Sequence, residues 1–357
     1  MEHNDVTQLF PKDNALIKSA YTTRRLPREA MITLRCDIVP CPGDLVLARV
    51  DKVGQHKCLE LADGRRSQLF TGDLITVVYG NRYAPDQYES VVPDHLGPCH
   101  LAASGGIASQ VVHRYGKTGH PTAITPLGLI GDRNSQVLNL ADWALPRGAY
   151  HANPPPTIAI VGTSMNAGKT TTAAYLIKGL VRAGLKVGAA KITGTGSGRD
   201  TWLMRDAGAT QVLDFIDAGV PSTYLLSSDK VEKVAGQLIH ELGRHGVDVI
   251  VLEIADGLFQ QETGYLMSSH SFLANIDGVL FAASDAMGGA AGVEWLRQHQ
   301  APVIGVSGLL TLSPLAIREI HTATGLPVLT LAQLESAEIA QAMMDNLISI
   351  MPVLKAG

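Results

Sequence analysis

Residues 157–177 read "TIAIVGTSMNAGKTTTAAYLI", and three structural signals follow one another in this stretch. Six apolar or small residues predict a buried strand, a loop of small residues comes next, and apolar residues then recur at helical spacing from Lys169. A nucleotide-phosphate loop occurs in this context, between a buried strand and a helix, and ends in Gly-Lys-Thr. We therefore predict that the loop binds phosphate.

The residue types of this loop suit a polyphosphate. Backbone N–H groups at a helix N-terminus can converge on phosphate oxygens, and Gly168 has no Cβ to block them. Lys169 supplies a cation for the outer phosphates, and the Thr170 hydroxyl is a ligand for Mg²⁺. The predicted nucleotide-binding residues are Thr163, Ser164, Met165, Asn166, Ala167, Gly168, Lys169, Thr170 and Thr171.

The C-terminal half of the chain alternates apolar runs with helical patterns. Further strands are predicted at "KVGAAK", "VDVIVLEIAD", "IDGVLFAAS", "APVIGVSG" and "LPVLTL". Helices are predicted over residues 169–183, 231–246, 292–299, 313–324 and 336–351. Strands this uniformly apolar are buried on both faces, so we predict an α/β domain with a mostly parallel sheet sandwiched by helices.

The N-terminal half is β-rich. Strands are predicted at "DLVLARVD", "HKCLELA" and "DLITVVYG", with Asp63-Gly64 as a hairpin turn, which indicates a small barrel-like domain. Residues 97–116 are predicted as a glycine-led helix, and the chain from there to Leu145 is predicted to be rich in loops. Three prolines after Asn153 mark a linker, so the predicted domains are residues 1–152 and 153–357.

The overall composition excludes several classes of protein. The 357 residues are 46% hydrophobic and 17% charged with a net charge of −4, which suits two folded domains and gives no basic field for nucleic acid. The N-terminal residues lack a signal-peptide pattern, and the apolar runs are too short to cross a bilayer. Four cysteines do not form a disulfide scaffold in so long a chain. We expect a cytoplasmic protein without a nucleic-acid or membrane partner.

The spacing of the loop points to one group of enzymes. "GTSMNAGKT" has five residues between Gly162 and Gly168, and it resembles the loop of dethiobiotin synthetase and of cobyric acid synthase. Those families have G-T, four variable residues and then G-K-[ST]. They also have a lysine at the end of the second strand, here Lys191, and a glutamate at the end of a later strand, here Glu253. The resemblance covers about residues 157–330.

This resemblance implies an ATP-dependent enzyme that requires Mg²⁺, with GTP as the alternative nucleotide. The implied chemistry activates a carboxylate or carbamate as a mixed phosphate anhydride, which a nitrogen nucleophile then attacks. Lys169 and Lys191 would neutralise the migrating phosphoryl group, while Thr170 and Glu253 hold the metal. Two other functions are compatible with the motif, namely a small-molecule kinase and a nucleotide-driven switch or assembly chaperone. Analogy with the fold also suggests a homodimer.

Three aspartates are further candidates for the Mg²⁺ site. Asp256 follows Glu253 closely, Asp200 is either a helix N-cap or a metal ligand, and Asp206 is either a surface residue or a metal ligand. The sequence also departs from the dethiobiotin synthetase pattern at two positions. Ser164 replaces the loop aspartate, and Ser307 stands where that family has an asparagine that reads adenine.

Overall fold

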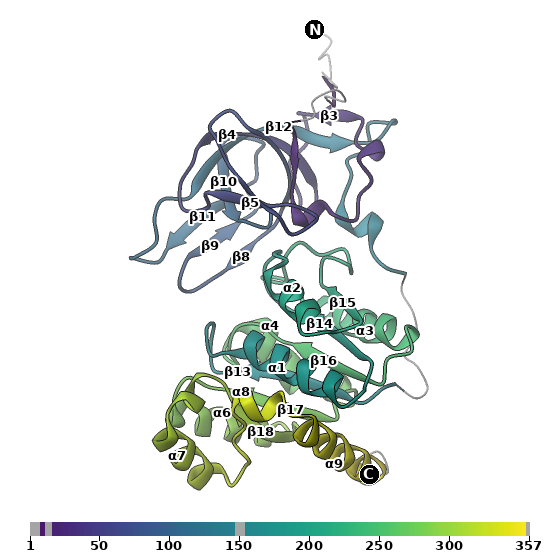
Figure 1. The fold of residues 1–357 in the computed structure, drawn as a ribbon. Helices are drawn as coiled ribbons and strands as arrows, with labels where there is room; N and C mark the ends of the chain where they lie inside the picture. The colour runs from purple at the N-terminus through teal and green to yellow at the C-terminus, as the bar shows by residue number, and fades with distance from the viewer. Residues whose placement is uncertain (1–7, 11–15, 147–153, 355–357) are drawn as a thin grey trace. The chain divides into compact units, whose positions relative to one another are not determined.

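The computed structural model describes residues 8–10, 16–146 and 154–354. Contacts divide the chain into two compact units (Figure 1). The barrel unit comprises Met1–Leu145 with the inserts Gly194–Arg199 and Phe215–Leu225, and the α/β unit comprises Pro146–Thr193, Asp200–Asp214 and Leu226–Gly357. The predicted domain boundary near residue 153 and most of the N-terminal segment considered for a signal peptide lie outside the described residues.

A closed sheet forms the centre of the barrel unit. Its strands pair in the ring β4–β7–β11–β10–β12 and back to β4, in which β7 and β11 are parallel and the other neighbours antiparallel. The strands are β4 (Leu45–Lys52), β7 (Leu74–Tyr79), β10 (Cys99–Ala103), β11 (Ile107–Arg114) and β12 (Thr122–Gly131). Alternate residues such as Val46, Ala48 and Val50 fill the core, because successive side chains of a strand point to opposite faces. The predicted barrel-like domain is confirmed.

Short strands extend this sheet or lie beside it. They are β1 (Gln8–Leu9), β2 (Lys18–Ser19), β3 (Thr33–Arg35), β5 (Cys58–Glu60), β6 (Arg66–Gln68), β8 (Arg82–Tyr83) and β9 (Tyr88–Val91). β5 and β6 form the predicted hairpin: Gly64 adopts φ +84° in its turn, and the Leu61 N–H donates to Arg65 O. The positive φ explains the glycine at this turn.

Two predictions for the N-terminal half are wrong. The predicted helix at 97–116 is the hairpin β10–β11, in which Gly106 takes φ +106° at the turn and β-branched residues such as Ile107 and Val111 favour a strand. The segment before Leu145 that was predicted to be rich in loops contains the ten-residue strand β12. Pro126 and Gly128 concealed this strand, because they interrupt the apolar pattern at a register shift against β4.

His56, in the barrel unit, makes folding sensitive to acid. Burial, followed by the positive charges of Arg82 and Arg66, lowers the pKa of His56 to about 4. The ring Nε2 lies 3.0 Å from Arg82 Nη1 and 2.8 Å from Ala102 O, and the ring contacts Tyr88 edge-on. The folded state therefore keeps this imidazole neutral at a pH where the unfolded chain protonates it.

We expect the free energy of unfolding to fall by about 2 kcal/mol between pH 7 and pH 5 through His56 alone. In the unfolded chain the imidazole takes up its proton near its ordinary pKa, and in the folded protein only near pH 4. Chemical denaturation at both pH values measures the effect. His56→Gln should remove this part of the loss, whereas replacement of the exposed His120 by glutamine should not. Equal losses in the wild type and His56→Gln would contradict the assignment.

The α/β unit is built on one parallel sheet. Its strand order is β15-β14-β16-β13-β17-β18, and all its strand pairs are parallel. The strands are β13 (Thr157–Gly162), β14 (Val187–Lys191), β15 (Gln211–Asp214), β16 (Val249–Glu253), β17 (Gly278–Ala282) and β18 (Val303–Ser307). The central strands are buried throughout, which confirms the predicted α/β fold.

Helices cover both faces of this sheet (Figure 1). Ala189 and Leu280 share a core cluster with side chains of α1 (Lys169–Arg182) and α9 (Ala337–Leu354). Gly188, just before Ala189, and Phe281, just after Leu280, face the opposite side of the sheet. On that side Gly188 packs against α3 (Ser228–Arg244) and Phe281 against α6 (Ala286–Gln298). The remaining helices are α2 (Arg199–Asp206), α4 (Gln261–Ser268), α5 (His270–Leu273), α7 (Pro314–Thr324) and α8 (Leu331–Leu334).

The predicted helices agree with α1, α3, α7 and α9, while residues 292–299 are the C-terminal part of the longer helix α6. The strand predicted at "LPVLTL" is wrong: a single bridge joins Val328 to Val306, and Thr330 then caps α8. The short strand β15 was not predicted. Within the described ranges, every helix is too short or too polar to cross a membrane.

Candidate nucleotide site

The loop between β13 and α1 lies at the switch point of the sheet. β13 pairs with β16 on one side and β17 on the other, so the chain leaves the sheet where ligands bind in open α/β folds. Asn166 and Gly168 take φ +66° and +99°, which turns the loop into the first turn of α1. Gly168 is the N-cap of α1 and makes no side-chain cap bond, so the first N–H groups of this helix are available to an anion.

Neighbouring strand ends hold the loop in place. The Leu309 N–H donates to Ala167 O at 3.1 Å, and the Thr163 N–H donates to Ala282 O at 3.0 Å. A Cβ on Gly308 would lie 2.5 Å from Ala167 O, and one on Gly257 would lie 2.2 Å from Thr163 O. Glycine is therefore required at both positions for the close approach of the backbones. Gly308 and Gly257 were not predicted as site residues. Each follows an apolar strand within a few residues, and that position was the only indication of their role in the sequence.

Gly168→Ala should weaken both folding and nucleotide binding. An added Cβ would lie 3.1 Å from Gly308 Cα and 3.3 Å from Leu309 N, in a backbone conformation that L residues rarely adopt. We expect a loss of about 2–3 kcal/mol in the free energy of unfolding, of which about 1–2 kcal/mol is backbone strain. Thermal unfolding with and without nucleotide measures the effect.

Gly184, just after the end of α1, is the matched control. It takes φ +87°, and no atom of the described residues lies within 4 Å of its added Cβ. Gly184→Ala should therefore cost only the backbone strain and leave nucleotide affinity unchanged. Equal effects of the two substitutions would show that the packing of Gly168 against Gly308 has no role.

Lys169 is buried beneath the loop, with 6% of its surface exposed. Its ammonium group donates to Ser164 O at 2.6 Å, which holds it against the loop. Burial lowers the pKa of Lys169, and the nearby carboxylates of Glu253 and Asp256 oppose that change. The side chain thus carries its charge to the place where the outer phosphates of a nucleotide are expected.

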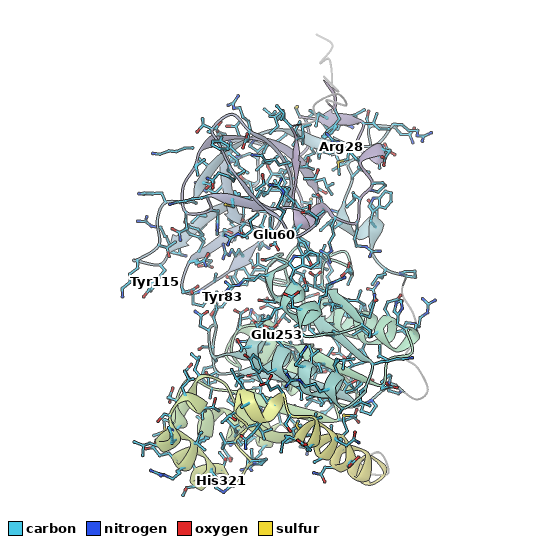
Figure 2. All side chains as sticks on the ribbon, viewed as in Figure 1. Arg28, Glu60, Tyr83, Tyr115, Glu253 and His321 are labelled. Carbon is cyan, nitrogen blue, oxygen red and sulfur yellow. The ribbon has the colours of Figure 1, made fainter. Side chains whose placement is uncertain are left out.

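Glu253, which Figure 2 labels, is the last residue of β16. Only 2% of its surface is exposed. The Thr170 hydroxyl donates to Glu253 Oε1 at 2.7 Å, while Oε2 is buried and has no hydrogen-bond partner in the described part of the chain. Burial raises the pKa of Glu253 even though Lys191 and Lys169 lie nearby. A buried carboxylate oxygen without a partner is costly, and a bound cation would offset that cost.

The Thr170–Glu253 pair therefore fits Mg²⁺. Hydroxyl and carboxylate oxygens are ligands that this ion prefers, and it commonly keeps several waters and phosphate oxygens as well. Among the described residues, no three His, Cys, Asp or Glu side chains gather as a metal-binding group. A metal ion here would accordingly take most of its ligands from nucleotide and water.

Lys191, the last residue of β14, forms an ion pair with Asp200 and is 9% exposed. Burial lowers the pKa of Lys191, but the carboxylates of Asp200 and Glu253 together raise it more, so this amine stays protonated.

The predicted N-cap role of Asp200 is wrong, because α2 begins at Arg199 and Asp200 lies inside its first turn. Asp206 is exposed at the opposite end of α2. The remaining candidate, Asp256, takes φ +63° just after β16, and its charge acts on both lysines.

Two further side chains define this edge of the sheet. Thr193 accepts a hydrogen bond from the Ala255 N–H at 2.8 Å, which ties the segments after β14 and β16 together. Ser307 is fully buried, and its hydroxyl donates to Leu329 O at 2.7 Å. Its side chain is thus turned inward and does not take the place of the adenine-reading asparagine in the dethiobiotin synthetase pattern.

Comparison with known proteins gives one match to a protein family. Residues 157–258 match the family of molybdopterin guanine dinucleotide synthesis protein B (MobB). No curated protein shows significant sequence similarity to the chain. Together with the loop geometry, the family match supports a P-loop NTPase domain that binds nucleotide, but not the finer resemblance to dethiobiotin synthetase or cobyric acid synthase.

Solved structures show weaker similarity. The signal recognition particle 54 kDa protein of Aeropyrum pernix K1, in complex with GDP, is 17% identical over 59% of this chain and 54% of its own, with a TM-score of 0.37. The receptor FtsY of Elizabethkingia anophelis is 18% identical over 48% and 59%, with a TM-score of 0.31. Chloroplast FtsY of Physcomitrella patens is 17% identical over 53% and 62%, with a TM-score of 0.35. The chain therefore spans less than two thirds of each of these proteins.

Proposed function

We propose that this chain is a Mg²⁺-dependent NTPase that transfers the terminal phosphoryl group of its nucleotide to a small molecule. The observation that carries the proposal is the buried Glu253 carboxylate: one oxygen accepts from the Thr170 hydroxyl, and the other has no hydrogen-bond partner among the residues that the structure describes. Mg²⁺ bound there would neutralise charge on the phosphate oxygens. The remaining roles belong to side chains and amides of the chain itself.

The loop amides and two lysines supply positive charge at complementary points. Residues 163–171 bind the phosphates through backbone N–H groups, and Lys169 stabilises the outer phosphate. Lys191, which Asp200 and Glu253 keep protonated, stabilises charge that develops on the transferred group or on an anionic acceptor. Catalysis of this kind depends on positioning and electrostatics and requires no nucleophilic side chain.

The acceptor is proposed to be a carboxylate or carbamate, activated as a mixed anhydride before attack by a nitrogen nucleophile. Support comes from the resemblance around Lys191 and Glu253. A small-molecule kinase would instead leave a stable phosphoester. A regulatory switch or assembly chaperone would hydrolyse nucleotide slowly, without any small-molecule acceptor, and bind a protein partner according to its nucleotide state.

The nucleotide is proposed to be GTP, with ATP as the competing outcome. The matched family is named for a guanine dinucleotide, and the inward-facing Ser307 does not supply the adenine-reading side chain of the ATP-dependent pattern. Competition of unlabelled GTP and ATP for a fluorescent nucleotide measures this preference directly.

A phosphate-release screen tests the proposed function. Purified full-length protein is incubated with Mg²⁺ and γ-labelled GTP or ATP, alone and with panels of carboxylates, amino acids and amines. Acceptor-dependent release of free phosphate with both co-substrates present indicates ligation, and label retained on the acceptor indicates a kinase. A rate of hydrolysis that no acceptor changes, but that a protein partner does change, would favour the regulatory switch or assembly chaperone. Absence of nucleotide binding would refute the proposal.

The same proposal includes a homodimer. Exposed apolar side chains follow the carboxyl ends of β16, β17 and β18, namely Phe259, Met287, Leu309, Leu312 and Leu315. Apolar residues concentrated on one edge are typical of an interaction surface. Light scattering with and without nucleotide should show a dimer that Phe259→Ser weakens, and a monomer under all conditions would contradict it.

A further inference from the structure

The barrel unit contains a cavity of about 410 Å³ beside the hairpin β5–β6. This volume lies within the range of small-molecule sites, which is roughly 300–1,000 Å³. The cavity is lined by Gln55, His56, Lys57, Cys58, Arg66, Gln68 and Ser104. Every lining residue lies between residues 55 and 104, so the cavity belongs to the barrel unit alone.

The lining is positively charged. It includes Lys57 and Arg66 but no acidic residue, and neither cation forms an ion pair within the part of the chain that the structure describes. Burial is the main cause of the lowered pKa of His56, and the positive charges of Arg82 and Arg66 lower it further. Gln55, Gln68 and Ser104 add neutral polar groups. An anion is the ligand that this arrangement favours.

We propose that this cavity binds a small anionic molecule through its carboxylate or phosphate group, and that binding changes nucleotide turnover. The first part stands on the cavity alone. The second part rests on the proposed NTPase function and on contacts between the cavity wall and the insert Gly194–Arg199.

Glu60 connects the cavity wall to that loop (Figure 2 labels Glu60). It follows the lining residue Cys58 on β5, and its N–H donates to Ser104 O at 2.8 Å. Its buried carboxylate accepts hydrogen bonds from the Gly198 N–H at 3.0 Å and the Ser197 hydroxyl at 3.1 Å. One residue therefore contacts both the cavity wall and the insert Gly194–Arg199.

The same insert rests on the turn next to Ser104. A Cβ on Gly105 would lie 2.1 Å from Gly196 O, so the two backbones are in direct contact. Along the chain, this insert begins three residues after Lys191 and ends one residue before Asp200. The side chains of Lys191 and Asp200 form the ion pair of the nucleotide site. A shift of β5 or of the turn on anion binding would therefore be passed through the insert to Asp200. Such a linkage couples two ligands reciprocally.

Calorimetry on the full chain tests the binding step with two probes, inorganic phosphate and malonate. We expect wild-type protein to bind one of them, which distinguishes phosphate from carboxylate ligands, and Lys57→Met/Arg66→Met to weaken that binding at least about tenfold. Arg49→Met is the matched control, since it removes an exposed cation of β4 outside the cavity. Failure to bind either probe, or equal affinity in the double variant, would overturn the proposed site.

The coupling step is tested by nucleotide turnover with and without the bound probe. We expect the probe to change kcat at least about twofold in the wild type, and Glu60→Gln to lose this response while it still binds the probe. Ser197→Ala removes one of the two insert donors to Glu60 and keeps the Gly198 N–H, so it should reduce the response and serves as the test if Glu60→Gln fails to fold. An undiminished response in either folded variant refutes coupling through the insert. If the wild type binds the probe but hydrolyses no nucleotide, the proposed function is refuted, and so is the coupling. The proposed anion site in the cavity is not affected by that result.

Discussion

Lys169→Ala is expected to lower kcat for nucleotide hydrolysis by about 10²–10³-fold or more, the loss typical of a deleted charge-stabilising group. The lysine is buried and fixed by its bond to Ser164 O, so its charge is already placed before nucleotide binds. In the proposed reaction, a charge placed in advance would stabilise the transferred phosphoryl group without reorganisation. Alanine at this position leaves the loop amides but removes the cation.

Steady-state phosphate release by purified protein measures this loss, and nucleotide titration separates affinity from turnover. Lys178→Ala is the control, because Lys178 lies on the same helix α1 and outside the loop. It should retain wild-type kcat and KM. Turnover near the wild-type level in Lys169→Ala would show that the reaction takes place elsewhere, even if the variant binds nucleotide.

The α/β unit could largely be predicted because its signals are local. A buried parallel strand is apolar along its whole length, and a glycine-lysine-threonine sequence after such a strand fixes both the turn and the start of α1. The same reasoning placed Glu253 and Lys191 at the ends of β16 and β14. Their catalytic and metal-binding roles stay predictions, since position alone does not establish chemistry.

The barrel unit was harder to predict, because its structure depends on distant partners. β12 is interrupted by Pro126 and Gly128, and its pairing with β4 joins segments that are far apart in the sequence. The insert Gly194–Arg199 lies in a polar, glycine-rich stretch without periodicity, so nothing local indicates that it belongs to the barrel unit. Its position depends on contacts with Glu60 and Gly105, which lie about 90 to 140 residues earlier in the sequence.

Glu253→Gln should have opposite effects on stability and activity. In metal-free buffer, glutamine removes a buried carboxylate whose Oε2 has no partner in the described chain, while its amide oxygen can still accept from Thr170. Glutamine also removes the negative charge that lies near Lys191 and Lys169, which lowers stability. Burial has the larger effect on the pKa of Glu253, so we expect the removal of the buried charge to outweigh that loss. We therefore expect a rise of about 1–2 kcal/mol in the free energy of unfolding without ligand.

Activity should fall at least about 10²-fold in Glu253→Gln, and the stabilisation by Mg²⁺ with nucleotide should shrink. Thermal unfolding with EDTA and with Mg²⁺-nucleotide measures both responses in one experiment. Glu241→Gln is the control, because Glu241 is a buried carboxylate on α3 that pairs with Arg244 outside the site. It should lose stability and keep activity. A Glu253→Gln protein that is stabilised by Mg²⁺-nucleotide as strongly as the wild type would exclude this carboxylate as a metal ligand, because removing a ligand must weaken the binding of the metal and so the stabilisation that it gives.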